Sequence, residues 1–106
     1  LNAILNQRSQ DMLTANNWNV CQYAALLIMF AKASGLEAGE LVHVIADAHI
    51  YDRHVDAVKR LIEKKPYPAP EMQVEDITDF YSFTKNSFTA VDYRYHEFTD
   101  KIPVAL

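Results

Sequence analysis

The chain has 106 residues, half of them hydrophobic and 11% aromatic, and it carries a formal net charge of −4 at pH 7. This composition predicts one packed globular domain, or a piece of one, and excludes a disordered or low-complexity chain. No apolar run has the length of a membrane span and no signal peptide is recognisable, so we expect no membrane contact. The acidic charge argues against a broad nucleic-acid surface, and the single cysteine fits a reducing, cytoplasmic compartment.

The first predicted element is a strand, because residues alternate in character from Leu1 to Ser9. The chain begins at Leu1, without a methionine and already inside this strand, so we expect it to be a fragment of a longer protein. Arg8 and Ser9 end the strand, and their guanidinium and hydroxyl groups are donors suited to a phosphate. The pair alone is a weak signal, since most surface arginines are only solvated.

A helix is predicted from Val20 to Ser34, capped by Asn17 or Asn19 and ended by Gly35. Apolar residues cover nearly all of its surface, which is typical of a buried central helix. Cys21 is therefore expected to be a small core residue rather than a catalytic thiol.

A second strand, Leu41–Tyr51, has two faces of different chemistry. One face is wholly apolar and is predicted to be buried, either in a sandwich of sheets or against the predicted helix. Its residues are Val42, Val44, Ala46, Ala48 and Ile50. The other face ends in Asp47, His49 and Tyr51. Because buried polar groups need partners, these three side chains either satisfy one another in the core or line a ligand pocket, and the pattern leaves both interpretations open.

The remainder of the sequence predicts shorter elements. A helix beginning near Asp52 is stopped by Pro66, and a short strand is predicted at Met72–Glu75. An irregular segment then leads to a strand at Phe88–Phe98, and the tail from Thr99 is expected to fray. The fold class so predicted is α+β, with a mixed β-sheet packed against a long buried helix.

No metal site is expected. His43 and His49 are six residues apart on one strand, and therefore about 20 Å apart at about 3.3 Å per residue. No other histidine spacing matches a known ligand pattern. From the residues alone, the sequence indicates an anion-binding α+β fragment with a pocket at Asp47, His49 and Tyr51.

Three segments, in this order and spacing, resemble thymidylate synthases: QRSQD at Gln7–Asp11, Asn19 before a buried helix, and ADAHIYDRH at Ala46–His54. The resemblance continues to the C-terminal Val-Ala-Leu and implies that residues 1–106 are the C-terminal portion of a single thymidylate synthase domain. It implies a methyltransferase of nucleotide biosynthesis that reductively methylates dUMP to dTMP. The cosubstrate would be 5,10-methylenetetrahydrofolate, which gives both carbon and hydride.

The resemblance also implies which residues bind. Arg8 and Ser9 would hold the phosphate of dUMP, and Asn19 would read the pyrimidine edge. His49 and Tyr51 would bond the sugar hydroxyl. The implied dUMP site comprises Arg8, Ser9, Gln10, Asp11, Asn19, His49 and Tyr51, and the implied folate site comprises Asp11 and Ala105. Tyr93 and His96 resemble a Tyr-x-x-His of the family, but we assign no role to them or to Asp47.

The sequence departs from the family pattern in places. The family's nucleophile is a cysteine, followed by a histidine, on a segment N-terminal to the Arg8–Ser9 pair, and Cys21 matches a position that is not catalytic. We therefore expect this chain alone to be inactive. The resemblance also implies that the complete protein is a homodimer, in which arginines of the partner subunit reach the phosphate. A loop at Ala15–Trp18 replaces a glycine and a Pro-Phe pair, and Gln10 replaces a frequent cysteine.

Two alternatives compete with this interpretation. A deoxycytidylate hydroxymethylase carries an Asp in place of the pyrimidine-reading Asn, so Asn19 argues against it. A non-catalytic domain that binds nucleotides or only dimerises would be favoured by a genuine coding sequence beginning at Leu1.

Overall fold

The computed structural model describes residues 1–103. Strand β1 (Ala3–Asp11), helix α1 (Asn16–Ala33) and strand β2 (Leu41–His49) come first and are the longest elements. A 3₁₀ turn at Asp52–His54 leads into helix α2 (Val55–Ile62) and strand β3 (Glu71–Val74). Two more 3₁₀ turns, at Phe80–Ser82 and Lys85–Ser87, precede strand β4 (Phe88–Val91). The predicted α+β class is confirmed.

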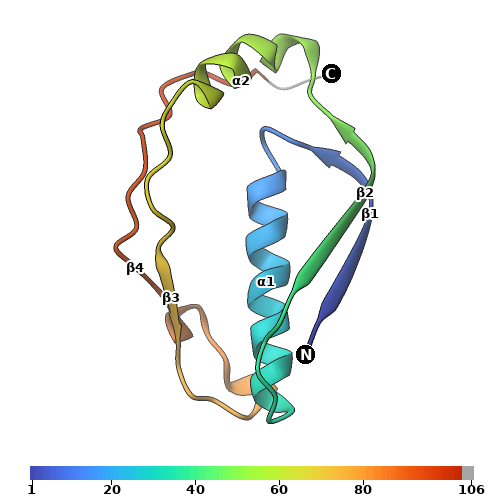
Figure 1. Ribbon diagram of the computed structural model, residues 1–106, viewed down its shortest axis with the longest axis vertical. Coiled ribbons are helices and arrows are strands. Elements are labelled where there is room, and N and C mark those ends of the chain that lie inside the picture. The colour runs from blue at the N-terminus through green and yellow to red at the C-terminus, as the bar shows by residue number, and fades with distance from the viewer. Residues whose placement is uncertain (104–106) are drawn as a thin grey trace.

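The strands pair in two separate sheets. β1 and β2 are parallel neighbours, whereas β3 and β4 are antiparallel neighbours. Figure 1 shows the chain running around α1, with β1 and β2 on one side, β3 and β4 on the other, and α2 across one end. Parallel and antiparallel pairing are thus both present, but the described residues do not join them into a single mixed sheet.

Helix α1 begins four residues earlier than the sequence predicts. Asn17 and Asn19 lie inside the helix, so neither caps it, and the residue before the helix makes no side-chain cap. The prediction of its end is confirmed. Gly35 has a φ of +66°, and the Leu36 N–H donates to the Ala31 carbonyl at 2.8 Å, which is the glycine-dependent way to close a helix.

The predicted burial of α1 and of β2 is largely wrong for this chain. In α1 only Leu27 and Ala31 are buried, and Cys21 is exposed rather than a core residue. The reason is that the described elements pack along limited parts of the helix and leave other parts of its apolar surface uncovered.

In β2 the apolar face is the outer one. Val42, Val44 and Ile50 are 45%, 48% and 42% exposed, and Ala46 and Ala48 are exposed as well. The opposite face, which carries His43 and His49, is the half-buried one. Burial of the apolar face against the helix is therefore wrong. The second sheet of residues 1–103, β3 with β4, lies on the other side of α1 and does not cover this face either.

The later elements follow the prediction with shorter bounds. β4 ends at Val91 rather than at Phe98, because Asp92 has a left-handed φ of +58° that an extended strand does not continue through. The tail was expected to fray, yet its described part is attached to α2 and to the 3₁₀ turn before it. Asp100 pairs with Arg60 at 2.5 Å, and the Pro103 carbonyl lies 3.0 Å from His54 Nε2. Ala105 lies outside the described residues.

Candidate functional site

The parallel pairing of β1 with β2 brings the polar ends of both strands to one edge. Ser9 stands opposite Asp47, and Asp11 stands opposite His49. Side chains of alternate residues share a face, so these four side chains lie on the same side of the sheet. This edge is the carboxyl end of a parallel pair, where α/β proteins commonly place ligands. We call these four residues the polar wall.

Contacts within the polar wall leave much of its hydrogen-bonding capacity unused. The Ser9 hydroxyl donates to Asp47 Oδ2 at 3.3 Å, and His49 Nδ1 lies 3.6 Å from the same oxygen. Tyr51 follows the strand, and its ring meets the His49 ring edge-on at 5.1 Å. Asp47 has 65% of its side chain exposed, so it does not form a closed core network with His49. The open pocket interpretation of this face fits the structure better than the core-network one.

Arg8 does not share the face of Ser9. It is exposed and lines a hollow with Asn6, Val44 and Ala46 on the outer side of the sheet. Within the described residues β1 pairs with β2 only, so its other edge is free. Arg8 and Ser9 consequently project from opposite sides of an unpaired strand edge. An anion lying along that edge could meet both side chains and the free backbone N–H groups.

Asn19 reaches the sheet from the first half of α1. Gln7 Nε2 donates to Asn19 Oδ1 at 3.2 Å and to the Ser9 carbonyl at 3.2 Å. Gln7 Oε1 in turn lies 2.8 Å from His43 Nε2. These contacts hold the Asn19 side chain beside the polar wall, with its amide nitrogen not engaged by Gln7.

Asp11 organises the turn that connects β1 to α1. One carboxylate oxygen accepts the backbone N–H groups of Leu13 and Thr14 at 3.0 and 3.1 Å, and the other accepts the Thr14 hydroxyl. Burial acts to raise the pKa of Asp11, but these hydrogen bonds, together with the nearby His54, outweigh it. The pKa of Asp11 therefore lies below its ordinary value of 3.8, and the carboxylate is ionised at neutral pH.

Gln10 lies behind the polar wall rather than on it. It is 1% exposed, its Nε2 donates to the Asp11 carbonyl at 3.2 Å, and its Oε1 has no hydrogen-bond partner in residues 1–103. The strand pattern explains this, since Gln10 alternates with Ser9 and Asp11 and projects to the other side.

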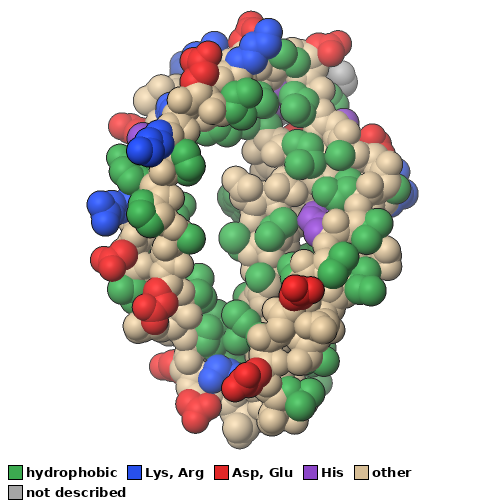
Figure 2. Space-filling view, in the orientation of Figure 1, with side chains coloured by type: hydrophobic (Ala, Val, Ile, Leu, Met, Phe, Trp, Pro, Cys, Tyr) green, Lys and Arg blue, Asp and Glu red, His purple; other side chains and the backbone are tan. Residues whose placement is uncertain are grey.

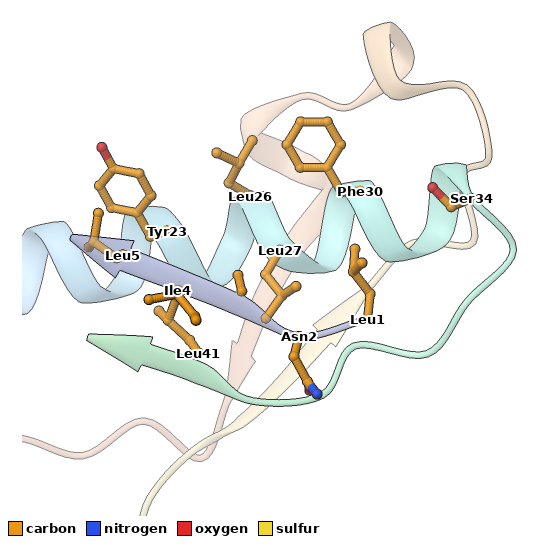
Figure 3. Close-up of a pocket in the computed structure, with 11 residues that line it drawn as sticks. Leu1, Asn2, Ile4, Leu5, Tyr23, Leu26, Leu27, Phe30, Ser34 and Leu41 are labelled. Carbon is orange, nitrogen blue, oxygen red and sulfur yellow. The ribbon is translucent and has the colours of Figure 1, made fainter. Parts of the chain in front are cut away.

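A separate hollow of about 430 Å³ opens at the other end of the same sheet. Figure 3 shows that it is lined by apolar side chains of α1 and of both strand beginnings, among them Leu27, Phe30 and Leu41. It lacks the clustered polar groups of the wall, so it offers little that would orient a polar ligand. Residues 1–103 contain no group of three His, Cys, Asp or Glu side chains placed to hold a metal ion, and no helix that could span a membrane.

Sequence reasoning missed Gln7 and the orienting position of His43. Both lie on the half-buried face, Gln7 two residues before Ser9 on β1 and His43 four residues before Asp47 on β2. Their signal was present, because two parallel strands joined by a helix must place their carboxyl ends together, and Gln7 and His43 then face the first turns of that helix.

Comparisons with known proteins lead to the same family that the sequence motifs resemble. The family model described as thymidylate synthase matches residues 1–106. The chain is 39% identical over 89 residues to the thymidylate synthase of Bacillus phage phi3T, an alignment that covers 83% of this chain and 32% of that protein. It is 38% identical over 97 residues to the bifunctional dihydrofolate reductase-thymidylate synthase of Paramecium tetraurelia, covering 92% of this chain and 21% of that protein.

A solved structure is similar over nearly the whole chain. The thermostable thymidylate synthase A from Bacillus subtilis matches with a TM-score of 0.84 and 36% identity, and the match covers 95% of this chain and 36% of that one. The chain therefore spans between 21% and 36% of the length of these relatives.

The turn at Asp11 can be tested by titration. Thr14→Val removes the hydroxyl donor, so we expect the pKa of Asp11 to rise toward 3.8. A lowered pKa stabilises the fold fully above the unfolded value and loses that contribution as pH falls through the folded value, so the variant should resist acid less well. Carboxyl ¹³C shifts measured against pH would report the change. An unchanged Asp11 titration, matching that of the exposed control Thr89→Val, would contradict this assignment.

Proposed function

We propose, since the chain belongs to the thymidylate synthase family, that the full-length protein containing it converts dUMP to dTMP with 5,10-methylenetetrahydrofolate. Residues 1–106 would form the C-terminal portion of a single catalytic domain. The observation that carries the proposal is the polar wall beside Asn19, because it offers separate groups for the phosphate, sugar and base of one nucleotide. A compartment with reduced thiols, the cytoplasm, suits such an enzyme.

The phosphate is assigned to Arg8 and Ser9. These side chains lie on either side of a free strand edge and can both donate to one anion. The Arg8 guanidinium gives charge-assisted hydrogen bonds, and the Ser9 hydroxyl gives a neutral one. The Ser9 hydroxyl now donates to Asp47, and because the Asp47 side chain is 65% exposed, that bond can be exchanged for one to phosphate at small cost. Further cations from a partner subunit would complete the neutralisation.

The base is assigned to Asn19 and the sugar to His49 and Tyr51. Gln7 engages Asn19 Oδ1, so the Asn19 NH₂ remains available to a uracil carbonyl, while Oδ1 can still accept a second N–H. The partly exposed His49 ring and the Tyr51 hydroxyl follow Ser9 along the wall, where a sugar would lie between phosphate and base. Gln10 is too deeply buried here for direct contact, so we assign it to supporting Asp11.

The folate is assigned to Asp11 and to the tail around Ala105. Asp11 is ionised and is held in place by the turn that it caps. The Pro103 carbonyl contacts His54, and the His54 ring meets the Tyr51 ring edge-on, with the ring centres 5.6 Å apart. The last described part of the tail therefore reaches this end of the site. The bound cosubstrate supplies the one-carbon unit and the hydride.

The nucleophile is assigned to a cysteine on a segment N-terminal to residue 1. Attack by its thiolate on the uracil ring makes the neighbouring ring carbon nucleophilic, and the wall described here holds the ring in place for that step. Cys21 is not that group. It lies two residues beyond Asn19, about 200° around the helix, and therefore points away from the base. We propose that residues 1–106 alone do not catalyse turnover.

A second copy of the chain is proposed to cover the outer face of β1 and β2. That face exposes Ile4, Val42, Val44 and Ile50 together, and Figure 2 shows hydrophobic side chains gathered along the side where Figure 1 places this sheet. Contiguous apolar surface of this kind marks an interaction site. Arg8 lies on the same face, beside Val44 and Ala46, which suits a nucleotide phosphate bound close to the partner subunit.

Base selection tests the function. In the full-length protein, Asn19→Asp replaces the NH₂ group by an acceptor, so the ratio of kcat/KM for dUMP over dCMP should fall at least about a hundredfold. Gln22→Glu adds the same charge at an exposed position of α1 and should leave the ratio unchanged. Steady-state rates with each nucleotide provide the measurement. An Asn19→Asp protein with the wild-type ratio would remove Asn19 as the base reader.

Self-association tests the outer face. Ala46→Glu places a carboxylate in the middle of that face, and a two-fold interface would bury it twice, which is strongly destabilising for association. We expect the variant to be monomeric by light scattering at concentrations where the full-length wild type is a dimer. Ala90→Glu, at an alanine of β4 that is also exposed, is the control and should remain dimeric. A dimeric Ala46→Glu protein would place the interface elsewhere.

A further inference from the structure

We propose that His43 is a positioning residue for base selection, acting through Gln7 on the Asn19 amide. This inference rests on the proposed function and adds a residue that is not part of the proposed nucleotide-binding set. His43 lies two residues before Ile45, the strand partner of Gln7, so the His43 and Gln7 side chains share one face of the sheet, where His43 is half-buried. Its Nε2 approaches Gln7 Oε1 at 2.8 Å, the shortest of the contacts made by the Gln7 side chain.

The direction of every hydrogen bond in this group follows from one atom. The Ser9 backbone carbonyl can only accept, so the Gln7 group that contacts it at 3.2 Å must be the NH₂ group. The Gln7 oxygen then faces His43, and Nε2 of that ring must carry a proton to donate to it. The second N–H of Gln7 points to Asn19, which must present Oδ1.

These linked hydrogen bonds determine which end of the Asn19 side-chain amide, Oδ1 or NH₂, faces the base. With Oδ1 held by Gln7, the Asn19 NH₂ is directed away from Gln7, and an NH₂ group matches the uracil carbonyl rather than the cytosine amino group. With the Ser9 carbonyl as its only partner at this end, Gln7 would have no donor for Oε1. A half-buried amide with one end unpaired can flip by 180° at small cost. His43 removes that freedom, because the reversed amide would face the imidazole N–H with its own NH₂.

Two substitutions in the full-length protein separate this role from packing. His43→Leu removes the donor but keeps an apolar side chain of moderate size, whereas His43→Gln retains an N–H able to reach Gln7. We expect His43→Leu to lower the ratio of kcat/KM for dUMP over dCMP by about tenfold, the loss expected when one oriented hydrogen bond is removed. His43→Gln should restore the ratio to within about twofold of wild type.

Nitrogen NMR provides a readout that packing alone would not change. At a pH about two units above the ordinary histidine value, the ¹⁵N shifts of the His43 ring should show the proton on Nε2. The His43→Gln protein identifies the signals by their disappearance. A neutral ring protonated on Nδ1 would overturn the proposal.

The kinetic outcomes are equally decisive. A wild-type ratio in His43→Leu, or an equal loss in His43→Leu and His43→Gln, would overturn the role of His43 while leaving that of Asn19 intact. A wild-type protein that uses neither nucleotide, or does not distinguish them, would instead overturn the proposed function. The pattern of loss in His43→Leu, rescue in His43→Gln and an Nε2 proton supports the proposal.

Discussion

The parallel pairing of β1 with β2 is the constraint on which the rest of this structure depends. Two parallel strands need a crossover between them, and α1 provides it, so the helix necessarily covers one face of the pair. The same pairing aligns Ser9 with Asp47 and Asp11 with His49. Residues 38 positions apart in the sequence thereby become a single row of polar side chains, and Asn19 is brought to that row by the first half of the helix.

The choice of face follows from this arrangement. The half-buried face carries Gln7 and His43, which can lie under a helix because they satisfy each other and Asn19. The apolar face of β2 is then directed outward, where it needs another surface to cover it. The polar wall and the proposed subunit contact are therefore two sides of one two-stranded sheet. A change in register by one residue would exchange them and remove both.

Local pattern was sufficient for much of the fold. The alternation in β2, the helical spacing in α1 and the glycine at position 35 predicted these elements to within a few residues. The start of α1 was missed because Asp11, five residues before the helix, organises the preceding turn and takes the place of a helix cap. β4 was predicted too long because alternation continues beyond the left-handed Asp92.

Burial was not predictable from the same pattern. An apolar strand face indicates that something covers it, but not whether the cover belongs to the same chain, and Val44 is 48% exposed in this one. In the site, too, some residues could be predicted from the sequence and others could not. Arg8, Ser9, Asn19 and His49 were identified from residue type and family resemblance. The contact between Gln7 and His43 depends on the pairing register, which no single strand carries in its own sequence.

Turnover by the full-length protein is the most direct test of the central claim. Incubation with dUMP and 5,10-methylenetetrahydrofolate, followed by chromatographic measurement of dTMP, should show product from the full-length protein and none from residues 1–106 alone. Cys21→Ala should leave the full-length rate close to wild type, because Cys21 lies on a part of α1 that points away from the base. A folded full-length protein that forms no dTMP, or a preparation of residues 1–106 that forms it, would contradict the account.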